Sequence, residues 1–187
     1  MATGSSTPGR LTRTTPWWSR PLKWSEVGCT IAHLSCWRQA ATRPEKCCLI
    51  LEDDAVFEPN LVKQLLGGLN QLEAAASGFD LVYLGRVPLE PDEPLMSGIV
   101  RPGYSHCTYG YLLTRGGVRL VLEAGLEQAL VPVDELLPAM YIAHPREDVR
   151  VIFPRRLRIL AFEPRLVAQL TKSQAGSDTE GSAGTKN

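Results

Sequence analysis

Three things are scarce in this sequence: net charge, long apolar runs and ordered cysteine spacing. Twenty basic and twenty acidic side chains cancel. Proteins that bind nucleic acid usually carry a basic excess, so that class is disfavoured. No apolar run approaches the ~20 residues of a membrane helix, and the Ser/Thr-rich start lacks the hydrophobic centre of a secretory signal. We therefore expect no transmembrane segment and no nucleic-acid partner.

The cysteines follow neither the spacing of a metal site nor that of a disulfide framework. The five are Cys29, Cys36, Cys47, Cys48 and Cys107. Their number is odd and three of them lie inside apolar segments, which favours buried free thiols in a reducing compartment. The sequence therefore predicts a cytoplasmic protein.

The sequence does contain enough apolar material for one core. Hydrophobic residues make up 44% of its 187 residues, and this length fits a single domain. Both ends are rich in small and polar residues, and such a composition does not offset the entropy lost on ordering. We expect a disordered leader over residues 1–16, one domain over residues 17–170 and a disordered tail over residues 171–187.

Apolar spacing predicts alternating helices and strands. The first helix starts after a Ser25 cap and buries Val27, Ile31 and Leu34. Further helices are expected at 61–76, 115–123 and 135–143, and strands at 47–51, 80–86, 105–114, 151–153, 157–162 and 166–170. Three prolines predict an irregular loop over 87–99. The order strand, helix, strand predicts a parallel pair whose strands end at one edge of the sheet, where open α/β folds bind ligands.

Three carboxylates, Glu52, Asp53 and Asp54, follow the first predicted strand directly. Like charges this close are stable only if they are solvated or share a cation, and oxygen ligands suit a hard divalent ion. Strand alternation places Glu52 and Asp54 on one side, about 6.5 Å apart. We therefore predict that they are metal ligands, Asp54 foremost. The alternative is an ordinary acidic turn.

A second acidic pair, Asp134 and Glu135, lies in a short segment between Pro132 and Pro138. A fixed position suits a catalytic carboxylate, so this pair is a candidate for catalysis. The alternative is that Asp134 only caps a helix. His33 is interpreted as a packed, hydrogen-bonded histidine rather than as a ligand.

The motifs, taken together and in order, resemble glycosyltransferase family 25, which contains bacterial lipopolysaccharide glycosyltransferases and animal collagen galactosyltransferases. The segments that carry the resemblance are Glu26 to Trp37, Leu49 to Asp54, Leu81 to Arg86, Tyr109 to Leu113 and Pro132 to Glu135. The features His144-Pro145, Ala161 to Pro164 and Ser177 to Glu180 look closer to the collagen branch. The resemblance runs from about Pro21 to Glu180.

The resemblance implies an α/β fold of the GT-A, Rossmann-like type with a mainly parallel sheet that lacks its first strand. It implies a metal-dependent transfer of a sugar, galactose foremost, from a nucleotide diphosphate sugar to a hydroxyl of a lipopolysaccharide, glycan or protein. Mn²⁺ or Mg²⁺ is then held by Glu52 and Asp54, and Asp53, Gly85 and Arg86 bind the nucleotide sugar.

The same resemblance makes Asp134 or Glu135 the base that takes the acceptor proton, and the sequence does not decide between them. A non-catalytic, adhesion-like remnant of the fold is the alternative. An aspartate-nucleophile phosphatase is disfavoured, because such an enzyme needs an acid two residues after the nucleophile and Ala55 stands there after Asp53.

Overall fold

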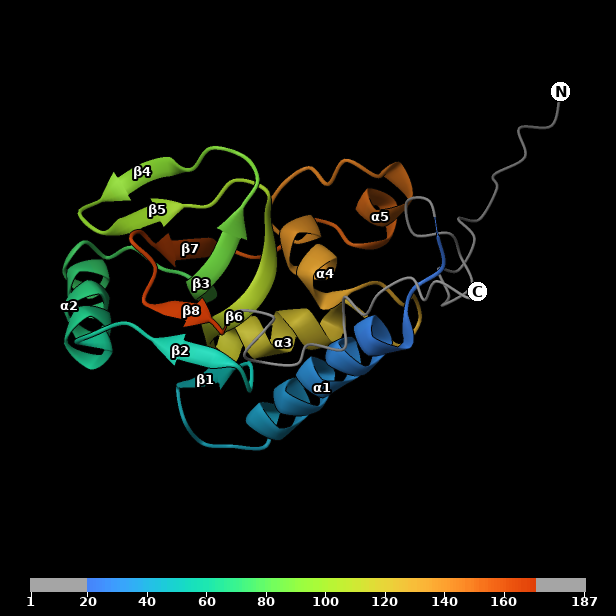
Figure 1. The fold of residues 1–187 in the computed structure, drawn as a ribbon, viewed down its shortest axis with the longest axis horizontal. Coiled ribbons are helices and arrows are strands. Elements are labelled where there is room, and N and C mark those ends of the chain that lie inside the picture. The colour runs from blue at the N-terminus through green and yellow to red at the C-terminus, as the bar shows by residue number, and fades with distance from the viewer. Residues whose placement is uncertain (1–19, 171–187) are drawn as a thin grey trace, which may run out of the picture.

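The computed structural model describes residues 20–170, drawn in colour in Figure 1. The predicted leader and tail lie outside the described residues. The helices are α1 (Trp24–Ala41), α2 (Leu61–Ala74), α3 (Arg115–Glu123), α4 (Val133–Ala139) and α5 (Glu147–Ile152). The strands are β1 (Cys47–Leu51), β2 (Ala55–Phe57), β3 (Leu81–Pro88), β4 (Glu93–Met96), β5 (Ile99–Arg101), β6 (Ser105–Thr114), β7 (Ile159–Phe162) and β8 (Val167–Gln169).

The main sheet is mixed rather than mainly parallel, so that part of the predicted fold is wrong. Its six strands follow the order β1-β6-β3-β7-β5-β4, and β2 pairs with β8 in a separate two-stranded sheet. Only β3 and β7 run parallel as neighbours among the described strands. The predicted parallel partners β1 and β3 do run in the same direction, but β6 lies between them and is antiparallel to both. The chain is therefore α/β.

Helices cover both faces of the sheet (Figure 1). Along β3, Leu81 and Tyr83 enter one core with residues of α1, α3 and α4, whereas Val82 and Leu84 enter a second core with Leu72 of α2. Successive strand residues point to opposite faces, so one fully buried strand serves two cores. Burial on both sides explains why the apolar residues of this strand form a continuous run in the sequence rather than alternating with polar ones.

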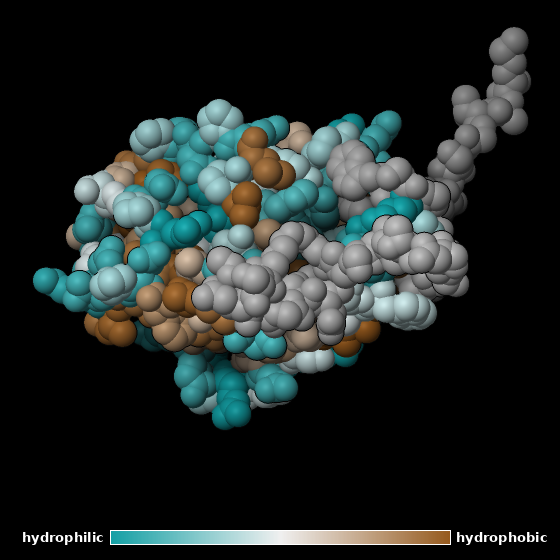
Figure 2. All heavy atoms as spheres, in the orientation of Figure 1, coloured by the Kyte–Doolittle hydropathy of each residue, from teal (hydrophilic) through white to brown (hydrophobic). Residues whose placement is uncertain are grey.

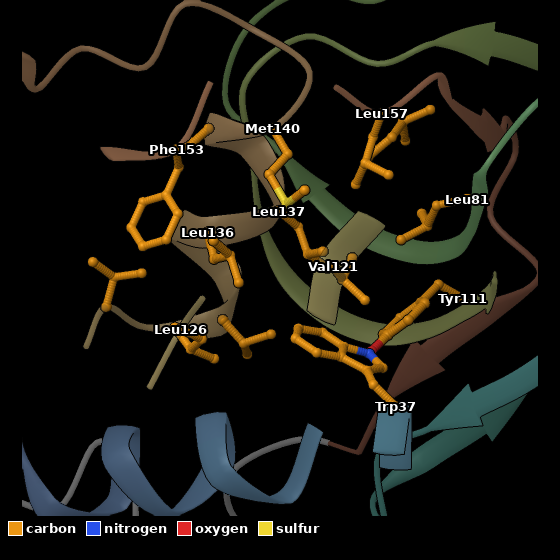
Figure 3. Packing of buried hydrophobic residues seen from close by; sticks show 14 of the residues in the cluster. Trp37, Leu81, Tyr111, Val121, Leu126, Leu136, Leu137, Met140, Phe153 and Leu157 are labelled. Atoms are coloured by element: carbon orange, nitrogen blue, oxygen red, sulfur yellow. The ribbon is translucent and has the colours of Figure 1, made fainter. Parts of the chain in front are cut away.

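The larger core also contains a buried polar contact. The Trp37 indole nitrogen donates to the Tyr111 hydroxyl at 2.9 Å, and Figure 3 shows the two groups pointing toward one another. Both side chains are fully buried. Buried polar groups normally need a partner, so this bond fixes the position of α1 against β6.

The buried face of α1 differs from the predicted one. The helix starts at Trp24, and the Glu26 carboxylate accepts a hydrogen bond from the Lys23 backbone as part of a capping box. Val27 is buried and His33 is packed and hydrogen-bonded, both as predicted, but Ile31 is 51% exposed. The apolar pattern failed at Ile31 because this helix turns the polar side chains of Thr30 and His33 inward, where they find partners.

Two further segments differ from prediction. Residues 87–99 contain the end of β3 and most of a β4–β5 hairpin, which turns at Gly98 with a φ of 75°. The run 151–153 falls in and just after α5, so its apolar residues follow a helix rather than a strand. In contrast, β6 and α3 have the predicted bounds.

Apolar side chains are exposed around β1, β2 and α2. They are Leu49, Leu51, Val56, Phe57, Val62 and Leu66. Figure 2 shows apolar residues gathered on the visible face over β2 and α2.

Within residues 20–170, no helix combines the length and the hydrophobicity needed to cross a bilayer. None of the five cysteines forms a disulfide, as predicted, but none is fully buried. The cytoplasmic location stays a prediction.

Candidate active site

The predicted acidic motif lies at an edge of the sheet shared by three strands. Leu51 at the end of β1 and Gly85 of β3 are both paired with Gly110 of β6. The chain leaves β1 at Glu52, whereas β3 continues past Gly85 and Arg86 to Pro88, which pairs with Ser105. The two strands run toward the same edge of the sheet, as expected, but they do not end together, and β6 separates them.

Glu52 is held in place by groups from α1 and β6. Its Oε1 accepts a 2.6 Å hydrogen bond from the Thr108 hydroxyl and lies 3.8 Å from Nε2 of His33. Burial alone would raise the pKa of Glu52, but His33 and Thr108 outweigh it and hold the pKa below its usual value. This carboxylate therefore stays ionised at neutral pH.

Asp53 and Asp54 form the turn between β1 and β2. Asp53 is exposed. Oδ2 of Asp54 accepts a 2.8 Å hydrogen bond from Gln169 of β8, whereas Oδ1 is buried and has no hydrogen-bond partner. Burial raises the pKa of Asp54, and the charges of Glu52 and Asp53 add to this effect. Glu52 thus has its partners on α1 and β6, whereas Asp54 has its partner on β8. The regular alternation of strand side chains stops at the turn, so the two carboxylates need not lie on one side.

Glu135, in the first turn of α4, is the centre of a buried hydrogen-bond network. Its Oε2 accepts from the Tyr104 hydroxyl at 2.5 Å and from Nε2 of His144 at 2.8 Å, and its Oε1 lies 3.2 Å from Nε2 of His106. Desolvation opposes ionisation, but the two histidines and the tyrosine outweigh it and lower the pKa of Glu135 to about 2. Glu135 is therefore a fixed negative charge.

The tautomer of His144 follows from its contacts. Its Nδ1 accepts a hydrogen bond from the backbone N–H of Arg146 at 3.2 Å, so the proton sits on Nε2, which donates to Glu135. His106 is half-buried, and the hydrogen bond to Glu135 raises its pKa.

Asp134 has the opposite environment to its neighbour. Its side chain is half-buried rather than fully buried. Burial first, and then the charge of Glu135, raise the pKa of Asp134 from 3.8 to about 6. Asp134 does not cap α4, because the cap residue is Pro132. A carboxyl group with this pKa exchanges its proton near neutral pH, which is the property of a general base.

Helix α1 links the two acidic motifs. The Thr30 hydroxyl accepts a hydrogen bond from the Val133 backbone N–H at 3.0 Å and lies 3.3 Å from the carbonyl oxygen of Val131, which fixes the chain just before Asp134. One turn later, His33 faces Glu52. Burial, followed by the charges of Glu52 and Asp134, raises the pKa of Cys29 to about 12. The segments that carry Glu52 and Asp134 therefore both lie against the part of α1 that contains Cys29, Thr30 and His33.

Arg86 and Gly85 have structural partners. The guanidinium of Arg86 is buried, forms an ion pair with Asp92 and donates to the Ser105 hydroxyl at 2.8 Å, while its Nε has no partner. A Cβ at Gly85 would lie 2.1 Å from the carbonyl oxygen of Val167, so the close backbone approach there is to the start of β8. Their predicted role in binding a nucleotide sugar stays a prediction.

Sequence reasoning missed the residues that hold the glutamates. They are Tyr104, His106, Thr108 and His144. A partial signal was present, because His106 and Thr108 lie in the predicted strand over 105–114 and Tyr104 directly precedes it. His144 leaves no comparable local signal, since its partner comes from α4.

Comparison with known proteins agrees with the motifs. Residues 14–86 match the model of glycosyltransferase family 25, described as an LPS biosynthesis protein family. Procollagen galactosyltransferase 1-B of Xenopus laevis is 38% identical over 158 residues, which is 81% of this chain and 26% of that protein. Probable inactive glycosyltransferase 25 family member 3 of Bos taurus is 35% identical over 176 residues, or 90% of this chain and 30% of that protein.

The human inactive glycosyltransferase 25 family member 3 is 35% identical over 82% of this chain and 27% of its own length. The chain thus spans a quarter to a third of the length of the curated relatives it matches. The ordered motifs, the family match and these relatives agree. The chain belongs to glycosyltransferase family 25.

Proposed function

We propose that this chain forms part of a glycosyltransferase of the GT-A type, which moves galactose from a nucleotide diphosphate sugar to a hydroxyl acceptor. Relatives named procollagen galactosyltransferases support the sugar and a protein acceptor. The description of the family as LPS biosynthesis proteins supports a saccharide acceptor. The observation that carries the proposal is the pair of opposite pKa shifts at Asp134 and Glu135.

In this proposal Asp134 is the general base. It accepts the proton of the acceptor hydroxyl as that oxygen attacks the anomeric carbon and the bond to the diphosphate breaks. Its pKa of about 6 leaves it ionised at neutral pH yet basic enough to take a proton. Glu135 is too acidic for this step and instead positions the loop around it through Tyr104, His106 and His144.

The residues of the β1–β2 turn fit a divalent cation. Oδ1 of Asp54 is buried without a hydrogen-bond partner, which is unfavourable unless a ligand such as a cation completes its environment. Asp53 is exposed beside it. We propose that Asp54, with Asp53, holds Mn²⁺ or Mg²⁺, and that Glu52 keeps its separate partners His33 and Thr108. A cation bound there supplies positive charge to the leaving diphosphate.

A non-catalytic role in binding is the second candidate. Relatives at 35% identity are named inactive or probably inactive. The guanidinium of Arg86 also forms an ion pair with Asp92 inside the protein, so its charge is already paired without a bound nucleotide sugar. In this candidate the chain keeps the fold and the charged edge but performs no transfer.

Transfer assays with Mn²⁺ and a panel of nucleotide sugars distinguish the two candidates. The assay uses a procollagen-derived peptide and a saccharide as acceptors, and calorimetry measures donor binding. We expect Asp134→Asn to reduce turnover by about 10²–10⁴-fold with donor binding unchanged, because only proton transfer is lost. We expect Asp54→Asn to weaken Mn²⁺-dependent donor binding instead.

Glu93→Gln, which alters an exposed carboxylate on β4, is the matched control for both variants. Donor binding without turnover in any assay supports the non-catalytic candidate. Turnover that is unchanged in Asp134→Asn would exclude Asp134 as the base.

A further inference from the structure

Three different metal-binding side chains converge between α1 and the end of β1. The Cys29 thiol, a ring nitrogen of His33 and a carboxylate oxygen of Glu52 all lie within 4.8 Å of one another. Cys29 and His33 are four residues apart and so share one face of the helix. Within residues 20–170, no other group of histidine, cysteine and acidic side chains meets this criterion.

The chemistry of these donors selects a class of metal. Thiolate, imidazole and carboxylate together suit Zn²⁺ and similar borderline cations, whereas Mn²⁺ and Mg²⁺ prefer oxygen ligands throughout. A tetrahedral Zn²⁺ with bonds of about 2.0–2.3 Å holds its ligand atoms roughly 3.3–3.5 Å apart. The 3.8 Å between His33 Nε2 and Glu52 Oε1 is close to that spacing.

His33 is already oriented by contacts behind it. Its Nδ1 lies 2.8 Å from the Tyr111 hydroxyl, and its ring stacks on Tyr111 with centroids 5.7 Å apart. The hydroxyl is itself fixed by the Trp37 indole. Nε2 is therefore the nitrogen that faces Glu52. Histidine ligands of metals usually have their second nitrogen bonded in this way.

Glu52 is oriented as well. The Thr108 hydroxyl donates to its Oε1 at 2.6 Å, which fixes the carboxylate in front of His33. Oδ2 of Asp54 takes its partner from β8 instead, and neither Asp53 nor Asp54 belongs to the group whose donor atoms lie within 4.8 Å of one another. The three ligands therefore form a group distinct from the proposed Mn²⁺ site.

We propose that Cys29, His33 and Glu52 bind a transition-metal ion of the Zn²⁺ class. Three protein ligands leave a fourth coordination position for water or a further ligand, as in exchangeable zinc sites. The proposal does not depend on glycosyl transfer, because none of Asp134, Asp53 and Asp54 takes part in it.

Cobalt spectroscopy of the full chain tests this site directly. Co²⁺ titrated into the reduced protein should give one equivalent of tetrahedral absorption in the visible range and a thiolate-to-cobalt band in the near ultraviolet, and Zn²⁺ should abolish both. Cys29→Ser should lose the thiolate band. Cys36→Ser, which alters an exposed thiol on the same helix, should keep it.

Tyr111→Phe sharpens the test, because it keeps the stacked ring and removes the hydroxyl behind His33. Loss of such a supporting contact weakens metal binding by about 10–100-fold. Circular dichroism and thermal unfolding of each variant separate loss of the site from loss of the fold. A thiolate band that persists in Cys29→Ser, or no tetrahedral Co²⁺ complex in the folded wild type, would overturn the proposal. Neither result would bear on transfer activity.

Discussion

The turn after β1 and the first turn of α4 carry the two acidic motifs of this protein, and they share one arrangement. In each, a glutamate is bound by histidine and hydroxyl groups that lower its pKa, as for Glu52 and Glu135. In each, burial raises the pKa of a nearby aspartate, Asp54 or Asp134. The glutamates are thus ionised and held in place by their partners, and the aspartates are the carboxyl groups whose protonation burial favours.

The two motifs differ in what surrounds the aspartate. Oδ1 of Asp54 lacks a hydrogen-bond partner, whereas Asp134 lies beside the charges of Glu135 and His106. An oxygen without a partner suits cation binding, and a carboxyl group with a pKa of about 6 suits proton transfer. The comparison therefore divides two roles between two aspartates.

The largest effect should follow removal of the fixed charge in α4. Glu135→Ala leaves Tyr104, His106 and His144 without their shared carboxylate, and each buried donor left without its acceptor costs about 1–3 kcal/mol. Urea unfolding at neutral pH measures the loss. Glu93→Ala, on an exposed carboxylate, should stay within about 0.5 kcal/mol of wild type. Equal stability of Glu135→Ala and wild type would show that the network contributes nothing.

A smaller effect, of opposite sign, is expected at Asp134. Its pKa is raised in the folded state, so its charge destabilises the fold fully above about pH 6, and this penalty disappears below about pH 4. Asp134→Asn should therefore stabilise the protein by roughly 2 kcal/mol at pH 7.5 and by nothing at pH 4.

The pH dependence at Glu135 should run the other way. Its pKa is lowered to about 2, so its charge stabilises the fold above about pH 4.5, and the benefit is lost as the pH falls toward 2. Thermal unfolding of Asp134→Asn and Glu135→Gln across this range compares the two directly. Parallel curves for the two variants would contradict the assignment.

The smallest effect concerns the other glutamate. Thr108→Val keeps the shape of the side chain but removes the hydrogen bond to Glu52, and a bond to a partly exposed charge contributes about 1 kcal/mol. The pKa of Glu52 should rise with the loss. Thr42→Val, whose hydroxyl is exposed at the end of α1, is the control in chemical unfolding. An equal change in both variants would show that Thr108 does not act through Glu52.

The sequence predicted local structure better than it predicted partners. The bounds of β6 and α3 follow from nearby residues: apolar and β-branched side chains in the strand, and Thr114, whose hydroxyl caps the helix by accepting from Gly117. The parallel pairing of β1 with β3 was wrong because an apolar run does not specify its neighbour. Here β6, which comes later in the chain, enters between the two strands.

The candidate site shows the same division. The positions of Asp54 and Asp134 at strand and helix ends could be predicted, because Pro132 and the apolar run before Glu52 mark those ends locally. The partners of the glutamates could not, since Thr108 lies 56 residues from Glu52 in sequence. In helix α1, the prediction that Ile31 is buried was wrong, whereas the prediction of a packed, hydrogen-bonded His33 was confirmed, although its partner Tyr111 could not be named from the sequence.

Carboxyl titration by ¹³C NMR tests the central claim, that one carboxylate of the α4 pair is fixed and the other exchanges its proton near neutral pH. Asp134→Asn and Glu135→Gln assign the two resonances in the wild-type protein. We predict a midpoint near pH 6 for Asp134 and near pH 2 for Glu135. Midpoints in the reverse order, or both near pH 4, would contradict the division of roles.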